Sequence, residues 1–167
     1  MKWVTRLHVH VDRTACPWLI KRFVDSKAEF LFVPVEKIEE TVKELKATPY
    51  DVPGVELGHH NDKCSFDAII KKFKLEDQAI LELAKIVRAA DTDTLATAPE
   101  AAGLEAIMTG LGIMSRNDAD TISKASTVYD ALYTNCKLKL IREKYKYDMG
   151  KMDRKQQREF LRKKLAE

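Results

Sequence analysis

The sequence predicts an α+β fold, with one helix-dominated domain and a small N-terminal parallel sheet. Three observations lead to this class. Apolar and polar residues alternate over residues 3–11, as they do in a half-buried strand. A second short apolar run, residues 28–33, follows a helical segment, and the order strand, helix, strand favours parallel pairing. From residue 65 onward, apolar residues recur with helical spacing.

The first strand is expected to end at Asp12, where either Asp12 or Thr14 can cap the following helix. Pro17 fits the first turn of this helix, because the N–H that proline lacks would have no partner there. The second strand ends before a proline. The next expected elements are a helix over residues 35–47, an extended segment or turn over residues 50–55, and helices beginning near Ser65, Glu76, Pro99 and Asp118.

The helix from Asp118 is expected to run to about Tyr147, and a separate helix is expected after Gly150. We therefore divide the chain into a domain of residues 1–147 and a basic helical extension of residues 148–167. From Lys137 onward the chain has twelve Lys and Arg against five Asp and Glu, a balance of +7, which leaves 17 against 21, or −4, for the remainder. A basic helix can contact nucleic acid, but an ordinary solvated helix face explains the same pattern.

The chain length and composition indicate a protein of one domain. A chain of 167 residues can bury a hydrophobic core without covalent cross-links. Its three cysteines are an odd number at wide spacing, so we expect free thiols and a reducing cytoplasm. Polar residues interrupt the N-terminal segment where a signal peptide needs apolar ones, and no stretch reaches the ~18 apolar residues of a membrane span. We expect a cytoplasmic protein with no membrane contact.

One short segment concentrates possible metal ligands. Glu56, His59, His60 and Cys64 lie within nine residues, with Gly58 between them. Carboxylate, imidazole and thiolate are the side chains that bind transition-metal ions, and a loop can bring them together. Adjacent histidines rarely both face one ion, so we expect one ligand and one outer histidine. The alternative is a solvated turn with two exposed histidines and a buried cysteine.

Cys16 is a second candidate for chemistry. The expected helix start places it in the first turn, beside Arg13, where the helix dipole and the guanidinium would both lower the thiol pKa. A reactive thiolate at this position could be catalytic. The alternative is a small hydrophobic side chain packed under Trp18.

Other polar groups stand in apolar surroundings. Asp91 and Asp93 follow an apolar helix at its negative end, where a carboxylate is poorly placed for stability, although Arg88 could simply pair with Asp91. Tyr129 and Asp130 lie inside the long helix. The basic residues near the first strand and helix would form an anion site if they converged, and they would be ordinary surface charge if they did not. They are Arg6, Arg13, Lys21 and Arg22.

Several stretches resemble one family. They are WVTR, VDRTACPWLIKRFVD, AEFLFVP, YDVPGVELGHHNDKCSFDAII, IVRAAD, APEAAGLEAI and VYDALY. In their order and spacing, over residues 3 to about 136, they resemble the C-terminal domain of ChrB-type chromate resistance proteins. That family is associated with chromate-inducible resistance and its regulation. Its members usually carry an additional N-terminal region, and a DNA-binding role that depends on that region is not expected here.

The resemblance and the flagged residues together suggest one pocket between the sheet and the helices. The expected metal ligands are Glu56, His59 and Cys64, with Asp91 or Asp12 as a fourth, and the expected ion is Zn or Fe. The expected anion-binding or carboxylate-holding residues are Arg6, Arg13, Arg22 and Arg88. The residues expected to surround the ligands without binding the ion themselves are His60, Asp67, Tyr129 and Asp130.

Three functions are compatible with this pocket. The first is a chromate-resistance protein that binds a transition-metal ion or a small oxyanion. The second is an enzyme that uses the metal or the Cys16 thiolate, for example to reduce chromate. The third is a regulatory module whose basic tail contacts DNA or a partner, although no helix-turn-helix spacing is evident. The sequence leaves enzymatic turnover and the oligomeric state open.

Overall fold

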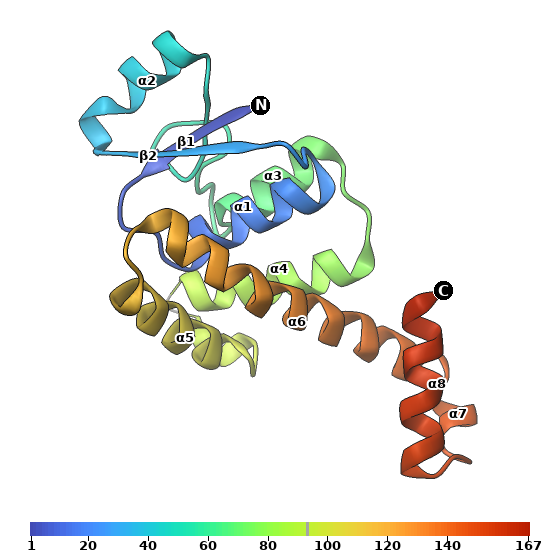
Figure 1. Cartoon of the computed structure of the whole chain (residues 1–167). Coiled ribbons are helices and arrows are strands. Elements are labelled where there is room, and N and C mark those ends of the chain that lie inside the picture. Colours follow the sequence, from blue (N-terminus) through green and yellow to red (C-terminus); the bar gives the residue numbers. More distant parts are fainter. Residues whose placement is uncertain (93) are drawn as a thin grey trace.

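The computed structural model describes residues 1–92 and 94–167. It confirms the α+β class, since a parallel sheet forms the N-terminal part and helices form most of the rest (Figure 1). The strands are β1 (Lys2–Arg6), β2 (Glu29–Val33) and β3 (Thr48–Pro49), in the order β2-β1-β3. Both neighbours of the central strand β1 run parallel to it, as the crossover rule predicts.

Helices lie on both faces of this sheet, and the later helices extend away from it. They are α1 (Val11–Phe23), η1 (Val35–Lys37), α2 (Ile38–Leu45), α3 (Ser65–Phe73), α4 (Gln78–Asp91), η2 (Leu95–Thr97), α5 (Ala101–Met114), α6 (Asp118–Lys144), α7 (Lys146–Met149) and α8 (Arg154–Ala166). The starts expected near Ser65, Glu76, Pro99 and Asp118 are all present within two residues. The helix expected over residues 35–47 is instead the turn η1 followed by α2, which ends where Lys46 takes a left-handed backbone conformation.

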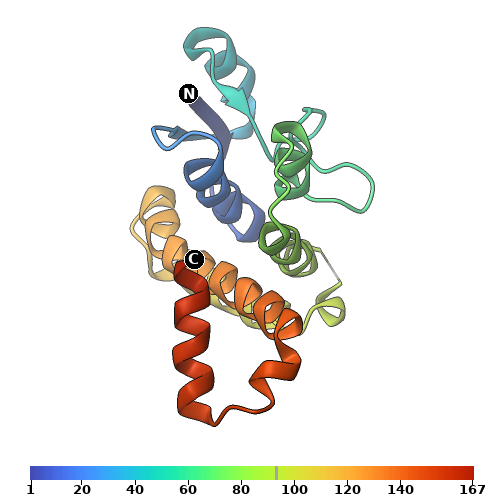
Figure 2. The same ribbon diagram turned by 90° about the vertical axis from the view of Figure 1, so that its right-hand side faces the viewer.

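Helix α1 lies at the centre of the molecule. It packs between the sheet and a layer formed by α4 and α6, with α3 beside it, as two perpendicular views agree (Figures 1 and 2). Cys16, Leu19 and Ile20 on α1 are fully buried. The opposite face of the sheet is covered by α2, where Val4 and Ile38 share a small second core. The N-terminus of α1 therefore meets several other segments inside the protein.

Strand β1 ends at Arg6, so the expectation that it extends to Asp12 is wrong. His8 has a φ of 64°, in the left-handed region, which turns the chain out of the sheet. The backbone N–H groups of His8 and Val9 then donate to the Asp118 carboxylate over 3.0 and 2.9 Å. The strand is ended by a side chain about 110 residues further along the chain, which an alternating pattern cannot reveal.

The start of α1 also differs from the expectation. The helix begins at Val11, and His10 precedes it without a side-chain cap, so neither Asp12 nor Thr14 caps it. Pro17 lies in the second turn and is buried. Because the helix starts earlier than expected, the Asp12 side chain is free to interact with a different helix.

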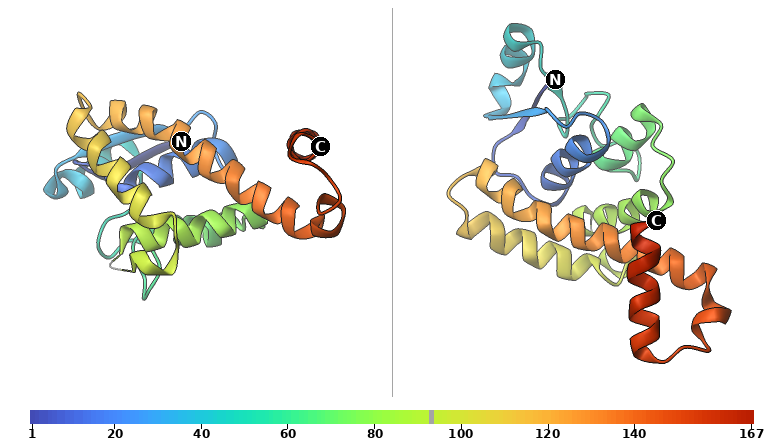
Figure 3. Two further views of the ribbon diagram at one scale, coloured as in Figure 1. Left: turned by 90° about the horizontal axis from the view of Figure 1, so that it is seen from below. Right: turned by 45° about the vertical axis from the view of Figure 1, so that its right-hand side comes forward.

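The chain ends in a helical extension. Helix α6 carries the chain away from the body, and α7 and α8 lie at its far end (Figure 3). Tyr145 and Phe160 stack edge to face there with ring centroids 5.3 Å apart. A helix is thus present where one was expected after Gly150, while the domain boundary at residue 147 stays a prediction. None of the helices in the described part of the chain combines the length and the apolar composition that a membrane crossing requires.

Candidate metal centre

Asp12 joins α1 to α3. Its carboxylate accepts hydrogen bonds from the backbone N–H groups of Ser65 (2.7 Å) and Phe66 (3.0 Å), the first two residues of α3. The Cys16 thiol donates to the same carboxylate over 3.4 Å. The Asp12 side chain is only 1% exposed. A carboxylate at a helix N-terminus is electrostatically favourable, so this contact fixes the two helix starts against each other.

Asp91 brings in the end of α4. It is the last residue of that helix, and its Oδ1 accepts a hydrogen bond from the backbone N–H of Asp12 over 3.2 Å. The end of α4 and the start of α1 therefore meet, which explains why a carboxylate stands at an unfavourable helix terminus. The alternative pairing of Asp91 with Arg88 does not occur, because Arg88 binds Asp67 instead. Asp93 lies outside the described residues.

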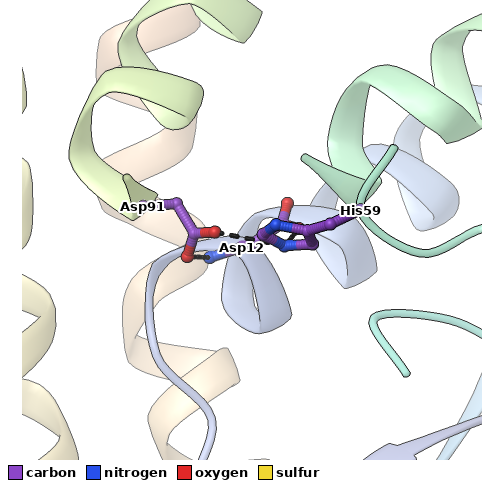
Figure 4. Close-up of side chains that lie close together, drawn as sticks. All are labelled: Asp12, His59 and Asp91. Atoms are coloured by element: carbon purple, nitrogen blue, oxygen red, sulfur yellow. Dashed lines mark hydrogen bonds and ion pairs between the residues drawn. The ribbon is translucent and has the colours of Figure 1, made fainter. Parts of the chain in front are cut away.

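His59 lies between these carboxylates. Its Nε2 is 3.3 Å from Asp12 Oδ2 and 3.3 Å from Asp91 Oδ2. Figure 4 shows the three side chains together. The loop that carries His59 runs from β3 to α3. The His59 side chain is 42% exposed, whereas the Asp12 side chain is buried and that of Asp91 is 14% exposed. We call these three residues the Asp12–His59–Asp91 cluster, and His59 forms its solvent-facing side.

Asp51 is a fourth participant that sequence reasoning missed. Its Oδ1 lies 3.1 Å from His59 Nε2, while its Oδ2 accepts from Arg13 (3.2 Å) and Arg6 (3.5 Å). Asp51 is buried and has a φ of 48°, a strained conformation for a residue other than glycine. The available signal was its place in the YDVPG stretch, just before a turn.

The ionisation of these groups reflects their crowding. The Asp12 hydrogen bond, together with the charges of Asp12, Asp51 and Asp91, raises the pKa of His59 to about 9. Burial, and then the charge of Asp12, raises the pKa of Asp91 to about 6 and also raises the pKa of Asp51. A protonated His59 therefore acts as the counter-charge of these carboxylates over the neutral pH range.

The free energy of unfolding of the metal-free protein is expected to fall as the pH rises from 6.5 to 9. The pKa of His59 is about 9 in the folded chain against 6.5 for a free imidazole. The folded state thus holds this proton more tightly, and its contribution is complete below pH 6.5 and lost through pH 9. Urea denaturation in EDTA at the two pH values measures the loss, which should shrink in His59→Gln.

The neighbouring His60 supplies the matched control. It is exposed, and its Nε2 lies 2.9 Å from the Glu56 backbone carbonyl oxygen, away from the carboxylates. His60→Gln should keep the pH dependence of the parent. Equal pH dependence in the parent and in both variants would contradict the role of His59 as a counter-charge.

The cluster has the spacing of a metal site. One ligand atom from each of Asp12, His59 and Asp91 lies within 4.8 Å of the others. An ion bound at about 2.0–2.2 Å from each oxygen and nitrogen needs its ligand atoms no more than about 4 Å apart. A small inward movement of these side chains would therefore bring all three ligand atoms within bonding distance of one ion. Within the described residues, Asp12, His59 and Asp91 are the His, Cys, Asp or Glu residues that meet this spacing.

Two expected ligands lie elsewhere. Glu56 is 69% exposed, and both of its carboxylate oxygens accept from Lys72 Nζ over 2.7 Å. Cys64 is buried just before α3, and its thiol faces Asp67 Oδ2 at 3.5 Å. Burial, followed by the nearby negative charges, raises the pKa of this thiol, so it is protonated at neutral pH. The structure therefore does not bring Glu56 or Cys64 into the cluster.

The four arginines do not converge on one anion site. Arg6 and Arg13 both bind Asp51, whose other carboxylate oxygen faces His59. Arg88 grips Asp67 through Nε (2.9 Å) and Nη2 (2.8 Å). The fourth, Arg22, binds Asp130 at 2.6 Å on another face, where the Trp18 indole N–H donates to the same carboxylate.

Cys16 and Tyr129 are fully buried near the cluster. The expectation of a lowered Cys16 pKa is wrong, because Cys16 lies in the second turn of α1 and burial, then the Asp12 charge, raises its pKa well above the ordinary value. These surroundings favour the alternative reading of a packed small hydrophobic side chain. Tyr129 donates to the Val11 carbonyl over 2.9 Å and shares a hydrogen bond with Thr14, which holds α6 against α1.

Comparison with known proteins agrees with the sequence patterns. The family described as "ChrB, C-terminal domain" matches residues 3–136, which include the whole cluster. A curated relative, "Protein ChrB" of Cupriavidus metallidurans (strain ATCC 43123 / DSM 2839 / NBRC 102507 / CH34), is 34% identical over 135 residues, which is 80% of this chain and 40% of the relative. The chain thus spans about two fifths of the length of that relative. No solved structure matches the chain.

Proposed function

Because this chain belongs to the family of the ChrB C-terminal domain, we propose that it is a metal-binding protein of chromate resistance. The proposed ion is a divalent transition metal held by Asp12, His59 and Asp91. One observation carries the proposal: two carboxylates and an imidazole from three separate segments present ligand atoms within 4.8 Å of one another.

The cost of burying these charges supports a bound cation. Asp12, Asp51 and Asp91 are mostly buried, and like charges at this spacing repel strongly in a site shielded from water. Arg6 and Arg13 form their ion pairs with Asp51, so the protonated His59 is the cationic side chain that contacts Asp12 and Asp91. A divalent ion would replace that proton and supply twice its charge.

The donor set narrows the choice of ion. An imidazole together with carboxylates suits Zn²⁺ or Fe²⁺ better than Mg²⁺ or Ca²⁺, which take oxygen ligands almost exclusively. The thiol of Cys64 is protonated and faces Asp67, so the softness that sulfur would add is not part of the proposal. Three protein ligands would leave positions for water or another small molecule, and a metal in such a site supplies Lewis acidity.

The link to chromate comes from the family. The proposed ligands lie within residues 3–136, the part of the chain that matches it, whereas α8 lies outside that part. Chemistry common to the family is therefore more reasonably assigned to the cluster than to the basic extension. For this reason we favour metal binding over a regulatory contact of the tail with DNA.

Metal analysis of purified protein distinguishes ligation by Asp12, His59 and Asp91 from the ligand set expected from the sequence, which included Cys64. The parent should hold about one ion per chain after loading with Zn²⁺ or Fe²⁺. His59→Ala should lose at least nine tenths of the metal, because it removes the ligand that faces solvent. Cys64→Ser should keep the metal content of the parent. Inductively coupled plasma mass spectrometry gives these ratios directly.

Absence of metal from the parent, or equal retention by the parent and His59→Ala, would refute the ligand assignment. The link to resistance needs a second experiment, in which a chromate-sensitive host expresses the parent or His59→Ala at equal levels. The parent should raise the chromate concentration that stops growth, and the variant should not. Equal protection by both would separate resistance from the metal centre.

A further inference from the structure

A surface hollow of about 610 Å³ opens beside His59. It lies between the loop that carries His59, the last turns of α4 and the turn η2. Its lining residues are His59, Asn61, Asp62, Lys63, Lys85, Arg88, Ala89, Thr92, Thr94 and Thr97. Because His59 is the solvent-facing member of the cluster, this hollow is where a small molecule could approach the proposed metal from outside.

The charged side chains of the hollow are mostly positive. The lining contains three basic residues, Lys63, Lys85 and Arg88, and one acidic residue, Asp62. Arg88 uses Nε and Nη2 to bind Asp67, which leaves its other terminal nitrogen, Nη1, outside that fork. Lys85 pairs with Glu82, but both side chains are well exposed, so this ion pair is weak and easily exchanged.

The hydroxyl groups of the lining have other partners. Thr92 donates to the Arg88 carbonyl and Thr97 donates to the Thr94 carbonyl, over 2.9 and 2.8 Å. Thr92 and Thr94 share a hydrogen bond of 2.7 Å. Each hydroxyl has only one hydrogen to donate. Recognition of an anion here would therefore rely on the ammonium and guanidinium groups rather than on the threonines.

We propose that this hollow binds a small divalent oxyanion next to the metal. The inference rests on the proposed metal function, since a divalent cation at the cluster would neutralise the two ligand carboxylates and so remove the repulsion that they exert on an anion. The anion-binding groups are Lys63, Lys85 and Arg88, and only Arg88 belongs to the arginine set that the sequence suggested. Binding of the metal and of the anion should each strengthen the other.

Isothermal titration calorimetry with sulfate and with phosphate tests this proposal. Zn²⁺-loaded parent protein at low ionic strength should bind both anions, and chloride should bind at least tenfold more weakly. The double variant Lys63→Gln/Lys85→Gln should lose at least tenfold in anion affinity with an unchanged metal content. Both lysines are exposed, so the variant should fold normally. Lys43→Gln, at an exposed site on α2, is the matched control.

The outcomes separate the two proposals. Metal binding without anion binding, or equal loss of anion affinity in Lys43→Gln and the double variant, overturns the anion site and leaves the metal site intact. If the parent binds no metal, the proposed function fails, and the same titration of metal-free protein decides the inference. Anion binding that the double variant abolishes would then support the hollow, and no binding would overturn it.

Discussion

Asp12→Ala is expected to lower the free energy of unfolding by roughly 2–4 kcal/mol even in EDTA, because each buried donor left without a partner costs about 1–3 kcal/mol. The Asp12 carboxylate accepts the N–H groups of Ser65 and Phe66, and alanine would leave both without an acceptor. Relief of repulsion from Asp51 and Asp91 offsets part of this loss. Urea denaturation in EDTA measures the effect apart from any metal.

Asp130→Ala is the matched control. Asp130 accepts from Arg22 and Trp18, but its side chain is 41% exposed, so water can replace it and the loss should stay within about 1 kcal/mol. Asp12→Asn keeps one acceptor oxygen and should lie between Asp12→Ala and the parent. Equal unfolding free energies for Asp12→Ala and Asp130→Ala would show that the Asp12 carboxylate does not hold α3 to α1.

The element types could be predicted from the sequence because each depends on a local period. Alternation over β1 and helical spacing after Ser65 reflect one buried face per element, which every segment carries in its own residues. Element ends depend on partners elsewhere. The strand β1 ends where Asp118 captures two backbone N–H groups, and no local pattern near His8 encodes that contact.

The candidate site could be predicted only in part, for a related reason. His59, Asp12 and Asp91 stood out as polar groups in unusual places, and the fold brings them together. Glu56 also stood out, because it is close to His59 in sequence, but it extends into solvent toward Lys72. Proximity along a loop does not determine which side chains face the same way.

Asp51 is the reverse case, a residue of the site that was not predicted from the sequence. An acidic residue before a proline-glycine turn is usually a solvated turn residue, so the place of Asp51 in the YDVPG stretch, its one local signal, does not distinguish it from such a residue. Its role comes from a left-handed backbone conformation together with Arg6 and Arg13, which reach it from β1 and α1. Such a residue is found only when the three segments are seen together.

Gly58→Ala is expected to weaken metal binding at least tenfold although it removes no ligand atom. A Cβ added to Gly58 would lie 2.7 Å from the Val52 carbonyl oxygen and 3.1 Å from that of Val55. Both are backbone atoms, which cannot rotate away, so the loop must move. His59 is the next residue, and its Nε2 now lies within 3.3 Å of three carboxylates. Displacement of the loop should also lower the unfolding free energy by about 1–3 kcal/mol.

Gly103→Ala makes the same chemical change where space is open. Apart from the backbone of α5 itself and the two adjacent residues, no atom of the described residues lies within 4 Å of the added Cβ, and Gly103 is the third residue of α5. Alanine should therefore raise the unfolding free energy by about 0.5–1 kcal/mol and leave Zn²⁺ affinity unchanged. The two variants should thus shift stability in opposite directions. If Gly58→Ala binds Zn²⁺ as tightly as Gly103→Ala, the close approach at Gly58 does not set the position of His59.

Comparison of Gly58→Ala with His59→Ala separates the effect of loop geometry on metal affinity from the effect of charge. His59→Ala removes the ligand and the counter-charge together, so lost metal there does not separate geometry from charge. Gly58→Ala retains every charge of the cluster and changes only the placement of the imidazole. Because metal ligands must lie close to their preferred positions, a misplaced imidazole should act nearly as a missing one. Weak Zn²⁺ binding by Gly58→Ala would therefore attribute affinity to the loop geometry rather than to the summed charge of the carboxylates.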